Sequence, residues 1–186
     1  IARTFQNIRL WKSMTVFENV LTAKHLRAKQ NIFSAALRIS VAEDRRMEKE
    51  TMELLEEQNL AQYRNDLATS LPYGLQRRLE IARALATDPK LLLLDEHTAA
   101  LDPGAAEKIL AMTTRIAAEQ KLTCLMVTHN MRAALALGNR TLMMNSGQII
   151  LDVSGEERAH MDVNDLLRRF RSGTGETLDN DRILLA

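Results

Sequence analysis

Four consecutive leucines, Leu91 to Leu94, stand out in the hydrophobic pattern of the chain, and two carboxylates, Asp95 and Glu96, follow them directly. An apolar run of this length fits a strand buried on both faces, as in a parallel sheet covered by helices. Ligands bind beyond the carboxyl ends of such strands. Asp95 could there hold a hydrated Mg²⁺, and Glu96 could polarise an attacking water. The alternative is a strand that simply ends in solvated acids.

Further apolar runs predict strands at Ile1–Phe5 and Leu122–Thr128, and a hairpin formed by Thr141–Met144 and Gln148–Val153. His129 follows the second of these runs. If the two buried strands lie in one parallel sheet, His129 belongs to the same sheet edge as the two carboxylates. This placement makes it a candidate functional residue rather than a structural histidine.

Apolar residues at helical spacing predict six helices, which we expect over 15–29, 44–59, 71–87, 104–120, 131–137 and 162–171. Thr15 and Glu18 form a capping-box pattern at the first of them. Pro72 suits a first helical turn, and Gly74 allows another molecule to approach the backbone closely. The amides of such a turn attract anions such as phosphate. On its own, this stretch also fits a purely structural helix.

Composition narrows the possible classes of protein. The 186 residues suffice for a sizeable core, and the net charge of +1 argues against a nucleic-acid surface or a polybasic membrane patch. A single cysteine, Cys124, excludes an internal disulfide framework, and its apolar neighbours predict a buried, inert thiol. No apolar stretch reaches the length of a membrane span. Because Ile1 already lies in a predicted strand, we expect further sequence upstream of it.

Five short motifs follow one another along the chain: Gln6, residues 71–76, Asp95 with Glu96, residues 99–102, and His129. In order and spacing they resemble the motifs of the nucleotide-binding subunit of ATP-binding cassette (ABC) transporters, and the resemblance covers nearly the whole chain. It implies an α/β fold, namely an incomplete P-loop NTPase (RecA-like) core with a parallel sheet, plus an α-helical subdomain. The implied division is a core strand and loop at 1–12, the α-helical subdomain at 13–88, the catalytic core at 89–160, and a C-terminal helix and tail at 161–186.

The resemblance also implies a role for each motif. Gln6 senses Mg²⁺ and the γ-phosphate of ATP, Asp95 binds Mg²⁺, and Glu96 is the catalytic base. His129 holds the γ-phosphate, and Asp102 belongs to the D-loop. The signature motif, which faces the nucleotide bound to a second subunit, consists of Leu71, Pro72, Tyr73, Gly74, Leu75 and Gln76.

The sequence departs from the family pattern at several points. Leu75 replaces a polar residue, which would weaken recognition of the partner's nucleotide, and His97 replaces a proline. The phosphate loop Gly-x-x-x-x-Gly-Lys-[Ser/Thr] does not occur in the sequence. That loop supplies most phosphate contacts and one Mg²⁺ ligand in this family. We therefore expect residues 1–186 alone to bind ATP poorly or not at all.

Two importer groups are similar to different parts of the chain. Up to about Pro89, including residues 2–6 and the Leu-Pro-Tyr-Gly of the signature motif, the sequence is similar to branched-chain amino-acid importers. Residues 95–103 and 127–156 are more similar to another importer group, whose substrates are amino acids or uncharacterised. Both similarities imply a transport subunit that hydrolyses ATP, with ATP and Mg²⁺ as its cofactors.

The implied partners are a second nucleotide-binding subunit, identical or not, and transmembrane permease subunits. A substrate-binding protein would act indirectly, and no nucleic acid is expected. The implied location is the cytoplasmic face of the cell membrane, as a peripheral subunit. Leu10 and Trp11 are candidate permease contacts, with packing inside the helical insert as the alternative. The competing functions are a soluble ABC-type ATPase without a transporter and a truncated remnant that does not hydrolyse ATP.

Overall fold

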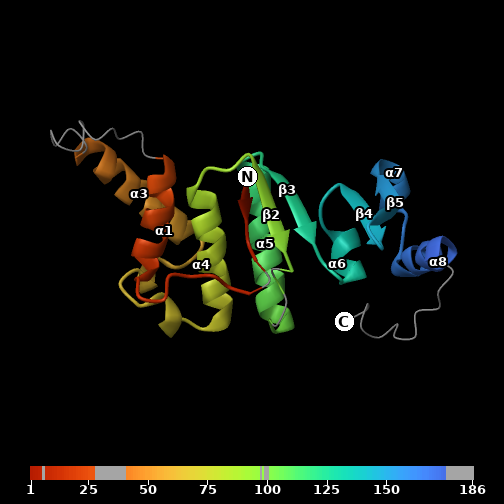
Figure 1. Ribbon diagram of the computed structural model, residues 1–186, viewed down its shortest axis with the longest axis horizontal. Helices are drawn as coiled ribbons and strands as arrows, with labels where there is room; N and C mark the ends of the chain where they lie inside the picture. The colour runs from red at the N-terminus through yellow and green to blue at the C-terminus, as the bar shows by residue number, and fades with distance from the viewer. Residues whose placement is uncertain (6, 28–40, 97, 99–100, 175–186) are drawn as a thin grey trace. The chain divides into compact units, whose positions relative to one another are not determined.

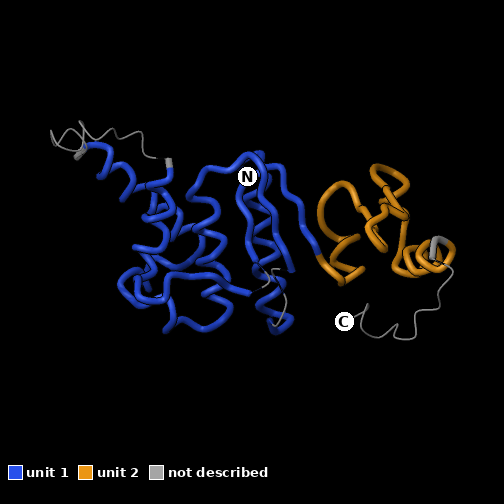
Figure 2. Tube along the Cα trace, viewed as in Figure 1, with its two compact units in different colours: residues 1–127 blue, residues 128–186 orange. Residues whose placement is uncertain are grey.

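The computed structural model describes residues 1–5, 7–27, 41–96, 98 and 101–174. The chain divides into two compact units, residues 1–127 and 128–186 (Figure 2). The first unit contains, in chain order, β1 (Ala2–Arg3), α1 (Val16–Lys24), η1 (His25–Arg27), α3 (Val41–Glu57), η2 (Ala61–Tyr63), η3 (Ala68–Ser70), α4 (Tyr73–Ala86), β2 (Leu91–Asp95), α5 (Pro103–Glu119) and β3 (Thr123–Val127) (Figure 1). The second contains α6 (Met131–Ala136), β4 (Arg140–Asn145), β5 (Gln148–Ser154), α7 (Gly155–Ala159) and α8 (Val163–Thr174). None of the described helices is long and apolar enough to cross a membrane.

The described strands of the first unit form a parallel sheet in the order β1-β2-β3. Ala2 pairs with Leu92, and Asp95 at the end of β2 pairs with Val127 at the end of β3. The parallel sheet predicted from the apolar runs is therefore confirmed. The first strand is shorter than the predicted run of five residues, although the N–H of Thr4 still donates to the carbonyl of Leu93 at 2.9 Å.

The leucine strand β2 is fully buried on only one of its faces. Leu92 and Leu94 are 1% and 0% exposed and pack against α4 and α5, whereas Leu91 and Leu93 are half-buried. On the neighbouring strand, Leu125 is 49% exposed. Burial of the strand on both faces, as the sequence predicted, is thus wrong for the described part of the first unit. The reason is that α4 and α5 pack on the same face of the sheet.

Helix α4 lies between two hydrophobic clusters of the first unit. Its Leu79 belongs to a cluster with Val16 of α1 and Leu55 of α3, all 0% exposed. Its Ile81 and Leu85 belong to another cluster, which they share with β2 and α5. Full burial of such a side chain contributes about 1.5–3 kcal/mol. Because residues of α4 are buried in both clusters, the helix is anchored on two different sides.

The six predicted helices are all present, and their ends follow from local hydrogen bonds. The capping box of α1 is confirmed, because Thr15 Oγ1 accepts from the N–H of Glu18 at 3.2 Å and Glu18 Oε2 accepts from the N–H of Thr15 at 2.8 Å. This backbone N–H holds the pKa of Glu18 below its usual range. A left-handed residue follows the last turn of both α3 and α5, namely Asn59 at φ 54° and Lys121 at φ 51°. Both ends have the paired backbone bonds of a Schellman motif.

The second unit is built on the antiparallel hairpin β4–β5, with α7 and α8 packed against the hairpin and α6 packed against α8. Its core consists of Met131, Leu151, Val153, Leu166 and Leu167. Arg158 closes the end of α6, since its Nη2 donates to the carbonyl of Leu135 at 2.7 Å and its Nε to Thr141 Oγ1 at 2.8 Å. The sequence predicted the hairpin, α6 and α8, but not the short helix α7.

Candidate functional site

The two carboxylates of the leucine strand lie where the sequence places them, at the carboxyl end of β2. The backbone N–H of Glu96 donates to the carbonyl of Val127 at 3.0 Å, so Glu96 remains tied to the end of β3. Its φ is 41°, in the left-handed region that a non-glycine residue occupies at a cost of about 1–3 kcal/mol. Glu96 thus ends the strand in a conformation that no regular strand residue adopts.

Asp95 has a cationic neighbour, Arg3, that was not predicted from the sequence. Nη2 of Arg3 donates to Oδ2 of Asp95 at 2.8 Å, with side chains that are 50% and 25% exposed. Arg3 lies on β1 in register with Leu93, two residues before Asp95. Because β1 and β2 are parallel neighbours, a long side chain on β1 can reach forward to the end of β2. Arg3 could have been predicted as the neighbour of Asp95 only if the pairing of β1 with β2 had been known.

The described residues near Asp95 suit a hydrated Mg²⁺ better than a metal enclosed by protein ligands. Among these residues, no group of three or more histidine, cysteine, aspartate or glutamate side chains could hold a metal ion. Mg²⁺ keeps several waters and takes one or two carboxylates together with phosphate oxygens. Asp95, a partly exposed carboxylate at the sheet edge, is the residue that would hold such an ion.

The predicted anion-binding turn forms the start of α4, with Pro72 at the N-cap position. The carbonyl of Pro72 accepts from the N–H groups of Leu75 and Gln76 at 2.9 and 3.0 Å. Nε2 of Gln76 donates to the carbonyl of Leu71 at 2.8 Å. Leu71 itself is buried in the hydrophobic cluster formed by α1, α3 and α4. The outward-facing part of the predicted motif is therefore its centre, where Tyr73 is 41% exposed.

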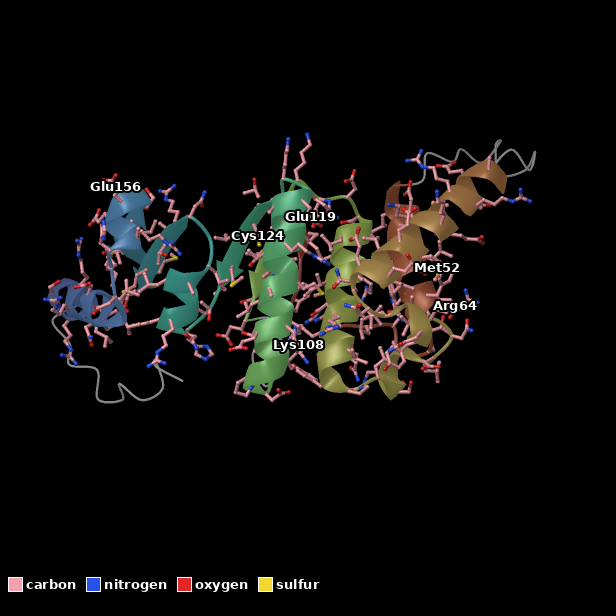
Figure 3. The ribbon with its side chains drawn as sticks, turned by 180° about the vertical axis from the view of Figure 1, so that it is seen from behind. Met52, Arg64, Lys108, Glu119, Cys124 and Glu156 are labelled. Atoms are coloured by element: carbon pink, nitrogen blue, oxygen red, sulfur yellow. The ribbon has the colours of Figure 1, made fainter. Side chains whose placement is uncertain are left out.

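A cleft of about 480 Å³ joins this turn to the first turn of α5. It is lined by Pro72, Tyr73, Gly74, Leu75, Arg78, Leu101, Asp102, Gly104, Ala105, Lys108 and Ile109. The two helix N-termini and two basic side chains, one of them Lys108 on α5 (Figure 3), favour an anion. The one carboxylate, Asp102, caps α5 by accepting from the N–H of Ala105 at 2.9 Å.

The structure thus brings two separately predicted motifs to one cleft, the turn at 72–75 and Asp102. Gly74 lines this cleft, and the space around it would also admit a larger residue. A Cβ there would lie 3.8 Å from Leu101 and 3.9 Å from Ala105. These are ordinary contact distances. The protein fold itself therefore does not require a glycine at this position.

His129 belongs to the second unit and is exposed. The residue after it, Asn130, begins α6 by accepting from the N–H of Ala133 at 2.9 Å and donating its own N–H to Thr128 Oγ1 at 3.1 Å. These bonds fix the backbone on either side of His129. The predicted grouping of His129 with Asp95 and Glu96 remains a prediction.

The remaining predicted residues are placed as follows. Gln6 lies outside the described residues, as do His97, Ala99 and Ala100. Cys124 on β3 is half-buried beside the cluster of β2, α4 and α5, and burial raises the pKa of its thiol. A raised pKa leaves little reactive thiolate at neutral pH, which agrees with the inert thiol predicted from the sequence.

The family model for ABC transporters matches residues 1–99. The chain belongs to the ABC transporter family. Its α/β fold with a parallel sheet is that of ABC ATP-binding cassettes. A cassette of an ABC transporter is 30% identical with a TM-score of 0.68, covering 84% of this chain and 62% of that one. A dimeric cassette bound to ADP and Pi is 28% identical with a TM-score of 0.66, covering 82% and 62%.

Curated ABC relatives are named as amino-acid transport proteins. The high-affinity branched-chain amino acid transport ATP-binding protein BraF of Pseudomonas aeruginosa is 37% identical, covering 84% of this chain and 62% of BraF. The tyrosine transport ATP-binding protein of Clostridioides difficile is 38% identical, covering 60% of this chain and 45% of that protein. The chain spans about 62% of the length of the branched-chain relatives it matches.

Proposed function

We propose that this chain belongs to the ATP-hydrolysing subunit of an ABC importer for amino acids. The observation that carries the proposal is the cleft in which the turn at 72–75 meets Asp102 between two helix N-termini. Such a cleft suits the phosphates of a nucleotide held mainly by a second subunit. The names of the amino-acid transport relatives support the substrate class and favour an importer over a soluble ATPase or a remnant without activity.

In this proposal, Glu96 acts as the general base that orients and deprotonates the attacking water. Gln6 senses the γ-phosphate, and His129 holds it. Asp95 would hold Mg²⁺, which neutralises phosphate charge when it is bound. The left-handed backbone of Glu96 supports its role, because strained residues of this kind cluster at active sites.

The proposed partners are a second nucleotide-binding subunit, permease subunits on the cytoplasmic face of the membrane and, indirectly, a substrate-binding protein. Trp11, 39% exposed, is the better candidate for a permease contact, because its backbone is held by Asn19 and its ring stacks on Arg83, 4.0 Å from ring centroid to guanidinium. Leu10 packs against the helical cluster, which supports a structural role for it. A second hollow of about 520 Å³, lined in part by Met52 and Arg64 (Figure 3), offers further surface on the helical part. The division into core and helical subdomain at 13–88 remains part of the proposal.

The test is ATP hydrolysis by the full-length protein and its Glu96→Gln variant. Loss of general-base help is expected to lower kcat by about 10²–10⁴-fold while nucleotide binding persists. The amide keeps the size of the side chain, so the unfolding temperature should not change. Turnover at the wild-type rate in this variant would remove Glu96 from the mechanism. In a separate experiment, uptake of labelled branched-chain amino acids and tyrosine by the assembled transporter in vesicles identifies the substrate.

A further inference from the structure

A buried ion pair lies one turn inside α4, behind the cleft. Nη1 of Arg77 donates to Oε2 of Glu80 at 2.6 Å, and the two side chains are 0% and 6% exposed. Removing two charges from water is costly, and apolar residues of similar volume commonly serve stability equally well. The contacts of the pair therefore indicate what the charges are retained for.

The pair holds both backbone polar groups of Phe5, just after the end of β1. Nη1 of Arg77 donates to the carbonyl oxygen of Phe5 at 2.6 Å, and the N–H of Phe5 donates to Oε1 of Glu80 at 3.3 Å. Side chains of α4 thereby replace the strand partners that the backbone of Phe5 would otherwise use. The next residue in the sequence is Gln6.

The same guanidinium reaches the first residue of α4. Nη2 of Arg77 donates to the hydroxyl oxygen of Tyr73 at 3.2 Å, and the guanidinium carbon lies 5.8 Å from the centroid of the Tyr73 ring. Tyr73 lines the cleft described above. A planar fork with several donors can serve these directions at once, which an ammonium on a flexible stem does poorly. One side chain thus bonds the exit of β1, its own helix and the cleft.

Another arginine of α4 provides a natural comparison. Arg83 is also partly buried, burial lowers its pKa, and it donates to a backbone carbonyl of the N-terminal segment, that of Arg9. Its guanidinium stacks on Trp11. The two arginines share a helix and a type of bond, but Arg83 bonds to the loop and Arg77 bonds to a residue of the cleft.

We propose that Arg77, held by Glu80, is a positioning residue that locks the exit of β1 to the first turn of α4. Through Phe5 and Tyr73 it makes the segment leading into Gln6 and the nucleotide-facing turn move as one piece. This inference rests on the proposed function for its kinetic consequence, but the lock itself is a property of the folded chain.

The experiment compares Arg77→Lys with Arg83→Lys in the full-length protein. Lysine keeps the positive charge beside Glu80 but loses the fork. Arg77→Lys is expected to lower kcat for ATP hydrolysis about tenfold and to change KM by less than about twofold, since the lost contacts orient the site rather than bind ground-state nucleotide. Arg83→Lys is expected to keep kcat within about twofold. All rates are measured below the onset of unfolding of every variant, so that lost stability does not lower kcat.

A double-mutant cycle with Tyr73→Phe tests the route of the effect. This change removes only the hydroxyl that accepts from Arg77. If Arg77 acts through Tyr73, the double variant Arg77→Lys with Tyr73→Phe is no slower than Arg77→Lys alone. Fully additive losses, an unchanged kcat in Arg77→Lys, or an equal loss in Arg83→Lys would each overturn the inference.

Amide hydrogen exchange without nucleotide measures the lock directly. In Arg77→Lys, the hydrogen-bonded amides of Phe5, Leu75 and Gln76 are expected to exchange faster together, whereas Arg83→Lys leaves them protected. If the wild-type protein does not hydrolyse ATP, the proposed function fails and exchange alone decides the inference. Unchanged protection of Phe5 and of the turn in Arg77→Lys then overturns it.

Discussion

Arg3 and Asp95 form an ion pair across two parallel strands, with Nη2 of Arg3 2.8 Å from Oδ2 of Asp95. The carboxylate that the proposed mechanism assigns to Mg²⁺ therefore already shares one oxygen with a permanent cation. Arginine is always charged at neutral pH. We therefore expect Arg3 to weaken the attraction of this carboxylate for a divalent ion.

Replacing Arg3 is expected to raise the apparent affinity of the proposed ATPase for Mg²⁺. In Arg3→Gln, the competing positive charge is absent, so the Mg²⁺ concentration for half-maximal ATP hydrolysis should fall by about threefold, a change consistent with one partly exposed charge pair. The measurement is a Mg²⁺ titration of the steady-state rate at fixed ATP. Arg9→Gln is the control, because Arg9 stacks on Phe5, with its guanidinium carbon 4.7 Å from the ring centroid. The same shift in both variants would contradict a specific role for the Arg3–Asp95 pair.

Gly74→Ala is expected to separate folding from function. The added Cβ meets only atoms at 3.8 and 3.9 Å, and alanine is favoured over glycine in a helix by about 0.5–1 kcal/mol. The free energy of unfolding should therefore stay the same or rise. The methyl group would nevertheless keep a nucleotide from approaching the backbone, and kcat/KM for ATP should fall by about tenfold or more. Urea unfolding and ATPase rates are measured on the same preparation.

The matched control for that variant is Gly147→Ala in the turn between β4 and β5. Gly147 has a φ of 80°, so alanine there is strained and the protein should lose about 1 kcal/mol of stability. Its ATPase rate per folded molecule should remain near the wild-type value. An unimpaired ATPase in Gly74→Ala would show that no ligand approaches this turn closely.

Glu50 is expected to make the helical part of the first unit sensitive to acid. Hydrogen bonds from Lys24 Nζ and Arg46 Nε, each at 2.6 Å, hold the pKa of Glu50 below its usual range. A carboxyl whose pKa is lower in the folded state stabilises the fold above its unfolded pKa of about 4.3, and this contribution disappears as the pH falls through the folded value. Glu50→Gln should therefore lose about 0.5–1 kcal/mol at pH 7 and nothing at low pH.

Urea unfolding at pH 7 and at pH 3 measures this difference, with Trp11, the single tryptophan of the sequence, as one fluorescent probe. Glu53→Gln is the control, because its ion pair with Lys49 is exposed and longer, at 3.7 Å. It should change stability by less than about 0.5 kcal/mol at either pH. A loss in Glu50→Gln that persists undiminished at pH 3 would contradict the electrostatic explanation.

Lys121→Gly is expected to stabilise the protein. Lys121 directly follows the C-cap of α5 and has a φ of 51°, a conformation that glycine adopts without steric cost. A gain of about 0.5–1 kcal/mol in the free energy of unfolding is expected. Asn59→Gly, at the corresponding position of α3, should gain less because asparagine tolerates this conformation better. A lower unfolding midpoint in Lys121→Gly would mean that the lysine side chain itself stabilises the helix end.

Much of the fold could be predicted from the sequence because its signals are local. The Thr15 capping box, the prolines at 72 and 103 and the leucine run each determine an element through their immediate neighbours. The start of α3 at Val41 was missed, although Ser40 and Glu43 have the spacing of a capping box in the sequence. The helix ends near Asn59 and Lys121 were predicted, but the left-handed conformation of Lys121 was not, because glycine, the usual marker, is absent there.

The candidate site was predictable where residues adjoin a strand end or a helix start, and not where contacts span the chain. Asp95, Glu96 and the turn at 72–75 follow from position alone. Arg77 and Glu80, three residues apart on a helix, have the spacing of an ordinary surface ion pair, yet they are buried against Phe5. Only the packing of α4 against β1 distinguishes the two situations.

The burial of α4 on two sides has a consequence for how the first unit loses its structure. Leu79 is enclosed by the cluster of α1 and α3, and Leu85 by the cluster of β2 and α5. If one cluster came apart while the other still held α4, one side of this helix would be exposed to water. We therefore expect the helical part and the sheet of this unit to unfold cooperatively, as a single foldon, even though they perform separate tasks in the proposed transport cycle.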